Sequence, residues 1–321
     1  MLIAVQIDQI EAFVAIVRHR GFTRAAAALH LSQPAVSRRL ELLERELGAP
    51  VLERLRGGAT LTEGGKAFLP HAEALLACVR DGVEAVRALE RTDRGAITLA
   101  LVGTLASTAL TSCLHGFREA YPEVQLRLRT ALSQEVSALV RRGDATLGLR
   151  YGLDPHPEVS ASTIFEEPML AVCSARHRLA RARRIEADAL AGEPWVTFPP
   201  RPGVTAEPYT TSLHQRLAAC GLGEAEIIPI DSLTAQKRMV EAGFGLALLP
   251  ESSVEEELRM GTLHPLRAPA MSATISVVLI RRRRGYLSGA ARRLMALLEA
   301  WPARRGGQRR GASRAARRVR Q

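Results

Sequence analysis

The chain lacks several features that would assign it to a common functional class. It has no run of about 18 apolar residues that could span a bilayer, and its N-terminus has no basic region that would mark a secretory signal. Its four cysteines, Cys78, Cys113, Cys173 and Cys220, show neither CxxC spacing nor histidines at metal-ligand spacing. We therefore expect no membrane span, no metal and reduced thiols in a cytoplasmic protein, with a redox switch as the minor alternative.

The sequence also lacks the short motifs of common enzyme families. No cofactor loop, metal-ligand spacing or nucleophile motif is present. Gly64, Gly65 and Lys66 match the end of a phosphate-binding loop, but that loop needs glycine and Ser/Thr where this chain has Thr60 and Ala67. We expect a non-enzymatic protein without a cofactor. An enzyme is kept as an alternative that turnover of a bound ligand would reveal.

Lysine is nearly absent, and the positive charge is unevenly placed. Lys66 and Lys237 are the only lysines, so 42 of the 44 basic residues are arginines. The net charge is +11, but residues 302–321 hold eight arginines and no acid, which leaves +3 for the rest. This low-complexity tail is expected to be disordered. It is either a solvated extension or a source of sequence-independent DNA affinity through counterion release.

The stretch 22–43 has the pattern of two short helices joined by a tight turn. Before it, apolar residues recur at helical spacing at Ile10, Phe13, Val14 and Val17. Thr23 is a candidate N-cap for the first helix of the pair. The turn spans residues 29–32, with its left-handed position near His30. This order predicts a helix-turn-helix, which inserts its second helix into the DNA major groove; an ordinary helical hairpin is the alternative.

The second helix of the pair would present polar side chains to DNA. Ser32 is a candidate N-cap, and Pro34 fits the first turn, where a missing amide hydrogen costs nothing. The buried side of the helix would consist of Val36, Leu40, Leu43 and Leu47. Gln33, Ser37 and Arg38 lie off that side near the N-terminal end. Their side chains can bond adenine, phosphate or guanine, so we expect them to contact DNA.

Two short extended runs, 51–54 and 59–62, predict a small β-hairpin after the helices. Arg54 and Arg56 in this wing would contact phosphates, and Thr23 would complete the DNA-binding surface. The net charge of residues 1–91 is only +1, from 12 basic and 11 acidic residues. The argument for DNA binding therefore rests on pattern rather than on charge.

These segments resemble the LysR-type transcriptional regulators. The resemblance rests on Phe13, Gly21-Phe22-Thr23, Ala25-Ala26, the run from Leu31 to Ser37, Leu42-Leu43-Glu44, Leu47-Gly48, and the run from Leu61 to Gly65. It continues weakly to about Trp301 and implies a winged helix-turn-helix, a long dimerising linker helix and an effector domain of two α/β lobes. The chain departs from the family pattern at Leu52, usually Phe, at Thr146, usually Asp, and at Arg178, usually Pro.

Residues 62–91 form the predicted linker helix, with Thr62 as its cap. Along it, apolar residues alternate at spacings of four and three at Ala72, Leu76, Val79, Val83 and Val86. This approximates the 3.5-residue repeat of a coiled coil. The repeat favours a homodimer or homotetramer, which suits a reader of two half-sites. Packing of this face within one chain is the alternative.

From Ala96 onward, strand-like and helical segments alternate, which predicts a parallel sheet. We expect an α/β fold with an N-terminal all-α winged helix-turn-helix, and the resemblance implies a two-lobed effector domain like that of periplasmic binding proteins. The predicted limits are 1–61 for the DNA-binding domain, 62–91 for the linker helix, 96–165 and 267–301 for lobe I, 166–266 for lobe II, and 302–321 for the tail.

Polar residues at strand ends are candidates for effector binding. Ligands in open α/β sheets lie beyond the carboxyl ends of strands, beside helix N-termini. That rule selects Thr104 and Ser107 after the first strand, Ser133 at a helix start, and Thr197 after a strand of lobe II. Arg150 could pair with a carboxylate. The resemblance implies that all five line the cleft between the lobes; a helix cap or an ordinary ion pair is the alternative for each.

The leading prediction is a sequence-specific transcription regulator that binds operator or promoter double-stranded DNA. A small-molecule effector, with an anion as one candidate, would bind between the lobes and shift the populations of dimer or tetramer geometries. A solute-binding protein is the second hypothesis. It leaves the first ~90 residues without a role.

Overall fold

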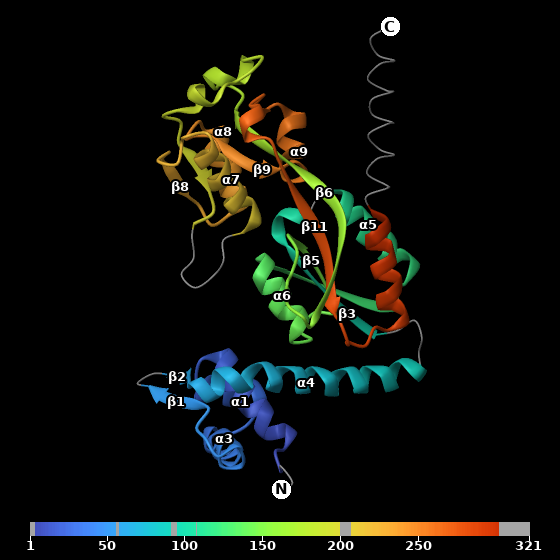
Figure 1. Cartoon of the computed structure of the whole chain (residues 1–321). Helices are drawn as coiled ribbons and strands as arrows, with labels where there is room; N and C mark the ends of the chain where they lie inside the picture. The colour runs from blue at the N-terminus through green and yellow to red at the C-terminus, as the bar shows by residue number, and fades with distance from the viewer. Residues whose placement is uncertain (1–3, 56–57, 91–94, 107, 200–206, 302–321) are drawn as a thin grey trace. The chain divides into compact units, whose positions relative to one another are not determined.

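The computed structural model describes residues 4–55, 58–90, 95–106, 108–199 and 207–301. Three predictions therefore lie outside the described residues: the roles of Arg56 and Ser107, and the disorder of the tail 302–321. The chain forms two compact units, one of Met1–Glu90 with Arg141–Asp144 and one of Arg91–Val140 with Ala145–Gln321 (Figure 1). None of the helices in these ranges is long and apolar enough to cross a membrane.

The N-terminal unit is a helical domain with a two-stranded wing. Its elements are α1 (Ile7–His19), α2 (Phe22–Leu29), α3 (Gln33–Leu47), β1 (Leu52–Leu55), β2 (Gly58–Leu61) and α4 (Glu63–Glu90). Val36, Leu40 and Leu43 of α3 are buried with Phe13 and Val14 of α1, as their spacing predicts. The strands β1 and β2 pair antiparallel, which confirms the predicted hairpin.

A left-handed residue forms the turn between α2 and α3. His30 has φ 56°, and the amide of Leu31 donates to the carbonyl of Ala26 at 2.9 Å, which confirms the predicted turn. The prediction that Thr23 caps α2 is wrong. Gly21 is the N-cap, because its carbonyl already accepts the first intrahelical bond, from the amide of Ala25. Thr23 lies inside the helix instead.

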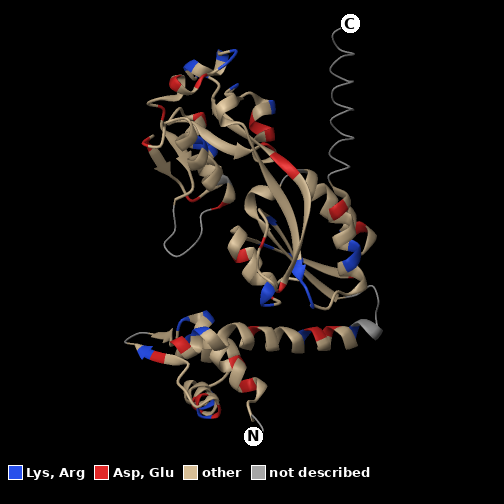
Figure 2. Cartoon of the chain, viewed as in Figure 1, with Lys and Arg blue, Asp and Glu red and all other residues tan. Residues whose placement is uncertain are grey.

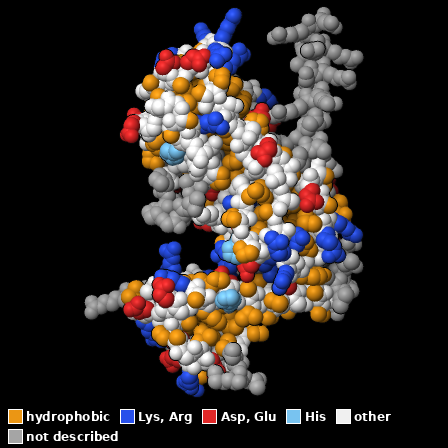
Figure 3. All heavy atoms as spheres, in the orientation of Figure 1, with side chains coloured by type: hydrophobic (Ala, Val, Ile, Leu, Met, Phe, Trp, Pro, Cys, Tyr) orange, Lys and Arg blue, Asp and Glu red, His pale blue; other side chains and the backbone are white. Residues whose placement is uncertain are grey.

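The linker helix α4 is capped as predicted but uses its apolar face in two ways. The Thr62 hydroxyl oxygen accepts a hydrogen bond from the Gly65 amide at 3.0 Å. Ala72 and Leu76 are buried in the core of the N-terminal unit. The first two residues of the predicted apolar repeat are therefore not exposed for contact with another subunit. Further along, four large apolar side chains are exposed by 42–64%: Leu75, Val79, Val83 and Val86. Figure 3 shows apolar side chains gathered along this helix.

The C-terminal unit is built on a mixed seven-stranded sheet. Its strands are β3 (Gly95–Val102), β4 (Val124–Ala131), β5 (Leu147–Tyr151), β6 (Val159–Ser174), β9 (Ala247–Pro250), β10 (Leu263–Pro265) and β11 (Ala273–Arg282). The order is β10-β6-β11-β5-β3-β4, with β9 also beside β6.

The prediction of a parallel sheet holds for only part of this sheet. The strands β4 and β5 run parallel to β3, but β11 runs antiparallel to β5 and β6, and β9 and β10 run antiparallel to β6. The long strand β6 carries the chain from the body around β3–β5 to a second body, and β11 carries it back (Figure 1). Two neighbouring strands that cross in opposite senses must pair antiparallel.

Helices and short turns complete the C-terminal unit. They are α5 (Thr108–Ala120), α6 (Ser133–Arg141), α7 (Pro208–Ala219), α8 (Leu233–Glu241), α9 (Glu251–Met260), a last helix at 289–301, and the 3₁₀ turns η1 (Gly103–Leu105), η2 (Arg178–Arg181), η3 (Ala187–Leu190) and η4 (Pro269–Met271). A separate parallel pair is formed by β7 (Trp195–Thr197) and β8 (Ile227–Pro229). The Trp301 ring packs edge-on against Phe165 at 5.1 Å, which fixes the last helix to β6.

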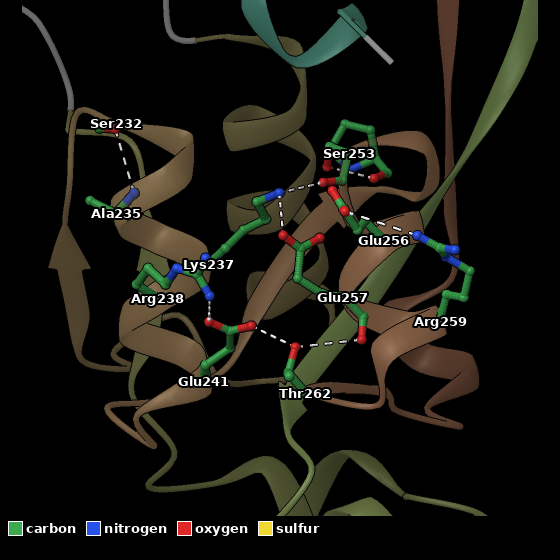
Figure 4. Close-up of polar contacts among 11 residues, drawn as sticks. Ser232, Ala235, Lys237, Arg238, Glu241, Ser253, Glu256, Glu257, Arg259 and Thr262 are labelled. Atoms are coloured by element: carbon green, nitrogen blue, oxygen red, sulfur yellow. Dashed lines mark hydrogen bonds and ion pairs between the residues drawn. The ribbon is translucent and has the colours of Figure 1, made fainter. Parts of the chain in front are cut away.

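The helices α8 and α9 are joined by a charged network (Figure 4). The ammonium of Lys237 lies 2.6 Å from Glu257 Oε1 and donates to the Ser253 carbonyl at 3.0 Å. Beside it, Arg238 pairs with Glu241 at 2.7 Å, and the Thr262 hydroxyl also donates to Glu241. The first pair is mostly buried, whereas Arg238 is exposed, so only the first should contribute strongly to stability.

Replacing Gly65 with Ala should destabilise the N-terminal unit by about 1–3 kcal/mol, because overpacked sites cost that much. A Cβ at Gly65 would lie 1.9 Å from the Val51 carbonyl oxygen, a backbone atom that cannot move aside. Gly82→Ala is the matched control in the same helix, since nothing lies within 4 Å of its Cβ position. It should stabilise the helix by about 0.5–1 kcal/mol. Urea unfolding that gives equal effects for both variants would contradict the packing argument.

Replacing Lys237 with Met should lower the free energy of unfolding of the C-terminal unit by about 3–5 kcal/mol, because Glu257 then stays buried without its partner. Arg238→Met, one residue along, should change it little. Thermal unfolding of the two variants measures the difference. If the two variants lose the same stability, burial of the Lys237–Glu257 pair does not explain the loss.

Candidate functional site

The N-terminal end of α3 carries the predicted DNA-contacting side chains. Ser32 is its N-cap, and the Ser32 hydroxyl oxygen accepts a hydrogen bond from the Ala35 amide at 3.3 Å, as predicted. Pro34 occupies the first helical turn. Ser32, Gln33, Pro34 and Arg38 are exposed and Ser37 is half-buried. The structure therefore places this predicted set on one accessible helix end.

Two details set the polar chemistry of this helix end. The Thr23 hydroxyl of α2 donates to Gln33 Oε1 at 3.3 Å, which orients the Gln33 amide from the neighbouring helix. Within the described residues, no hydrogen bond or ion pair involves the Arg38 side chain, whereas the next residue, Arg39, pairs with Asp8 at 3.2 Å. Arg38 is thus a cation free to bind another molecule.

The wing arginine has partners within the domain. The Arg54 guanidinium lies 4.4 Å from the centre of the Phe22 ring, a cation–π contact, and 3.9 Å from Glu41. These contacts hold Arg54 against α2 and α3, while its side chain stays more than half exposed. Figure 2 shows acidic and basic residues interspersed along the helices and wing of this unit.

In the C-terminal unit, Thr104 heads a chain of buried hydroxyl and carboxyl groups. The Thr104 hydroxyl donates to the Tyr151 oxygen at 3.1 Å, and the Tyr151 hydroxyl donates to Glu167 Oε2 at 3.3 Å. The other oxygen of Glu167 accepts the Ser252 amide at the start of α9, at 3.0 Å. Glu167 is 1% exposed, and both of its oxygens accept hydrogen bonds, as a buried carboxylate requires.

A second buried chain contains Ser133 and Arg150. Arg150 Nη1 donates to the Ser137 hydroxyl at 2.6 Å and pairs with Asp154 at 3.1 Å. The Ser137 hydroxyl donates to the Ser133 carbonyl at 3.2 Å. The Ser133 amide and hydroxyl both donate to Glu207, at 2.6 and 2.7 Å. Arg150, the predicted carboxylate binder, is therefore already paired with a carboxylate of the chain itself.

Two expectations for this region need correction or stay untested. The alternative that Ser133 is a side-chain cap of α6 is wrong, because the Ser133 hydroxyl donates to Glu207, and Glu135 instead accepts the amide of Leu132. Thr197 is buried in β7 and its carbonyl accepts the Ile230 amide. The described contacts do not join the Thr197 side chain to either chain of buried groups.

Burial and charge compete at the ends of the second chain. Burial lowers the pKa of Arg150, and Asp154 and Glu207 oppose that change. Burial raises the pKa of Glu207, against the two Ser133 donors and Arg150, which favour the carboxylate. The partners of Arg150 and Glu207 therefore offset part of the cost of burying these two charged groups.

The described part of the chain gives little support for a metal site or a reactive cysteine. No group of His, Cys, Asp and Glu side chains there could hold a metal ion. Burial raises the pKa of the Cys173 thiol to about 11, which makes it a poor nucleophile. A cavity of about 410 Å³ is lined by Met169, Met271, Arg183, Arg184 and Arg267, among others, and by none of the predicted effector residues.

The sequence interpretation missed the residues that complete the buried chains: Tyr151, Asp154, Glu167 and Glu207. Glu207 lies 74 residues from Ser133, so no local pattern links them. The one local signal is Pro208, which marks a helix start and makes the residue before it a helix cap.

Comparisons with known proteins agree with this arrangement. Residues 7–66 match the family model described as bacterial regulatory helix-turn-helix protein, lysR family, and residues 90–303 match the LysR substrate binding domain. The transcriptional regulator CfxR of Cupriavidus necator is 32% identical over 81% of this chain and 80% of its own length.

Solved structures show the same fold. Full-length OxyR from Pseudomonas aeruginosa has 18% identity and a TM-score of 0.66, over 92% of this chain and 94% of that one. CbnR complexed with its target DNA has 22% identity and a TM-score of 0.61, over 92% and 99%.

A helix-turn-helix reader joined to a two-lobed ligand-binding domain defines a DNA-binding regulator rather than an enzyme. The matched models cover most of the chain, and it belongs to the LysR family of transcriptional regulators. Its N-terminal domain binds DNA and its C-terminal domain binds an effector.

Proposed function

We propose that this regulator reads its operator with the N-terminal end of α3. The single observation that carries the proposal is the exposed helix end where Gln33 and Arg38 project, with Arg38 free of partners among the described residues. Arg can bond guanine and Gln adenine in the major groove. Thr23, Ser32, Pro34 and Ser37 would support these contacts, and Arg54 and Arg56 would reach phosphates from the wing.

The proposed domain limits follow from this division of labour. Residues 1–61 would bind DNA, 62–91 would join the subunits, and 96–301 would bind the effector, with lobe II at 166–266. Operator binding places the protein with the chromosome, so we propose a cytoplasmic location. The CbnR structure, which has this fold, is complexed with target DNA, which supports the proposed role of the N-terminal unit.

Replacing Arg38 with Ala should weaken operator binding by about 1–3 kcal/mol if Arg38 reads a base. Affinity for random DNA should change far less. Arg45→Ala makes the same change at the other end of α3, where the side chain is also exposed, and should leave the discrimination intact. Competition binding at fixed salt measures both affinities. Equal losses on operator and random DNA would mean that Arg38 contacts only phosphate.

The subunits would associate through the exposed face of α4. This face is formed by Leu75, Val79, Val83 and Val86, which the folded monomer leaves largely uncovered. A face of this length along one helix is typical of a coiled-coil contact. A second copy of the same helix presents the same face, so the contact is self-complementary.

Replacing Val83 with Lys should raise the dimer dissociation constant at least about 100-fold, because an ammonium group would be buried without a partner. The protein should then sediment as a monomer at micromolar concentration. Glu84→Lys adds a lysine at the adjacent exposed position and should stay dimeric. A dimeric Val83→Lys variant would exclude this face as the main subunit contact.

The effector would bind between the two lobes of the C-terminal domain. Thr104, Ser133, Arg150 and Thr197 are the described candidates, and Ser107 is the remaining one. Three of these have polar partners inside the domain, so a ligand must replace some of those bonds when it enters. An anionic group of the ligand could replace Asp154 as the partner of Arg150, or Glu207 as the partner of Ser133. This supports an anionic effector.

A further inference from the structure

The side chain of Glu207 connects the two bodies of the C-terminal unit, between residues that are far apart in the sequence. It is the residue before α7, in the body that carries β7, β8 and β9. Its two carboxylate oxygens accept the amide and the hydroxyl of Ser133, which begins α6 in the other body. The donor–acceptor distances, 2.6 and 2.7 Å, are those of strong charge-assisted hydrogen bonds.

The environment of Glu207 shows that this contact is enclosed. Glu207 is 6% exposed and Ser133 is 1% exposed. A carboxylate this deeply buried stays favourable only while donors and cations face it. Here the donors come from Ser133 alone, the nearby cation is Arg150, and Glu135 opposes the negative charge. Separation of the bodies would therefore remove both donors at one step.

Other links between the bodies differ in kind, and η1 of one body also packs against α9 of the other. The strands β6 and β11 are continuous backbone, paired with each other along their length, and can bend without breaking a covalent bond. Glu167 lies on β6 itself, so its bonds to Tyr151 and Ser252 follow that strand. The Glu207–Ser133 contact instead joins two helix starts, and it can open while the strands stay paired.

We propose that Glu207 is a latch that closes lobe II onto lobe I and must release Ser133 before a ligand can occupy the space between the lobes. The proposal rests on the proposed function in that it takes the interlobe region as the effector site. A carboxylate that the fold holds beside its donors competes strongly with a free ligand, because its ordering cost has already been met. The latch thus sets a threshold: a weak or dilute ligand does not open the lobes.

Amide hydrogen exchange of the full-length protein tests the latch without knowledge of the effector. Glu207→Ala should raise exchange of the Ser133 amide by about 10-fold or more, since the bond it loses is to a charged acceptor. Glu207→Gln keeps the shape and one acceptor oxygen and should give a smaller increase. Glu193→Ala is the control: Glu193 accepts bonds from His177 and Arg178 of the same lobe and does not contact α6.

Acetate then provides a chemical rescue. At about 0.2 M, acetate can enter the space that the Glu207 side chain leaves and should restore protection of the Ser133 amide in Glu207→Ala. Chloride at equal ionic strength should not. Unchanged exchange in Glu207→Ala, or equal effects of acetate and chloride, would overturn the proposal. If Glu207→Ala unfolds by circular dichroism, Glu207→Gln carries the test, and wild-type exchange at Ser133 in that variant is the refuting result.

Operator binding by the same wild-type preparation separates the two ideas. Failure to bind any specific DNA would refute the proposed function and leave the exchange result standing. Specific DNA binding together with an unprotected Ser133 amide would refute the latch alone.

Discussion

The need to pair every buried charge organises the C-terminal domain. An isolated ion taken out of water costs several kcal/mol, so Arg150, Glu167, Glu207 and Glu257 can be buried only where a partner meets them. Three of the partners come from another element: Ser252 at α9, Ser133 at α6, and Lys237 on α8. Asp154, the partner of Arg150, follows the same strand β5. The pairings of Glu167, Glu207 and Glu257 hold the helices α9, α6 and α8 in place, and the one between Glu207 and Ser133 joins the two lobes.

In the described part of the DNA-binding unit the charged side chains lie at the surface and not in the core. Its core is apolar, built from residues such as Phe13, Val36 and Leu43, and it needs no buried ion pair for α3 to hold its position. Arg38 is left exposed and has no partner among the described residues, so its guanidinium is available to an incoming molecule. The small net charge of this region means that a few well-placed side chains, rather than a broad basic surface, must give specificity.

Local patterns were sufficient for the helix-turn-helix. The left-handed His30, the Ser32 cap and the buried Val36–Leu40–Leu43 side follow from short-range rules, and the structure has all three. Thr23 as a cap was wrong because one residue earlier, Gly21, already served that role. In α4 the spacing predicted an apolar face but could not tell that Ala72 and Leu76 belong to the domain core while Val83 is exposed. That division depends on tertiary packing.

The sequence predicted the effector domain less completely. Alternating strands and helices predicted α/β structure, but the antiparallel β6 and β11 depend on the chain crossing between lobes twice. The candidate residues Thr104, Ser133 and Arg150 are buried polar groups with partners inside the domain. Their partners could not be predicted, because Glu207 and Ser133 meet only after the two lobes have folded.

Selection of binding sites from random-sequence DNA tests the central claim most directly. The full-length protein would be incubated with the library at about 0.15 M salt, where sequence-independent phosphate binding is weakened. The account predicts enrichment of an imperfect inverted repeat whose half-sites lie one helical turn, or a multiple of it, apart. Retention of DNA without any enriched sequence would contradict it, because binding would then rest on phosphate contacts alone.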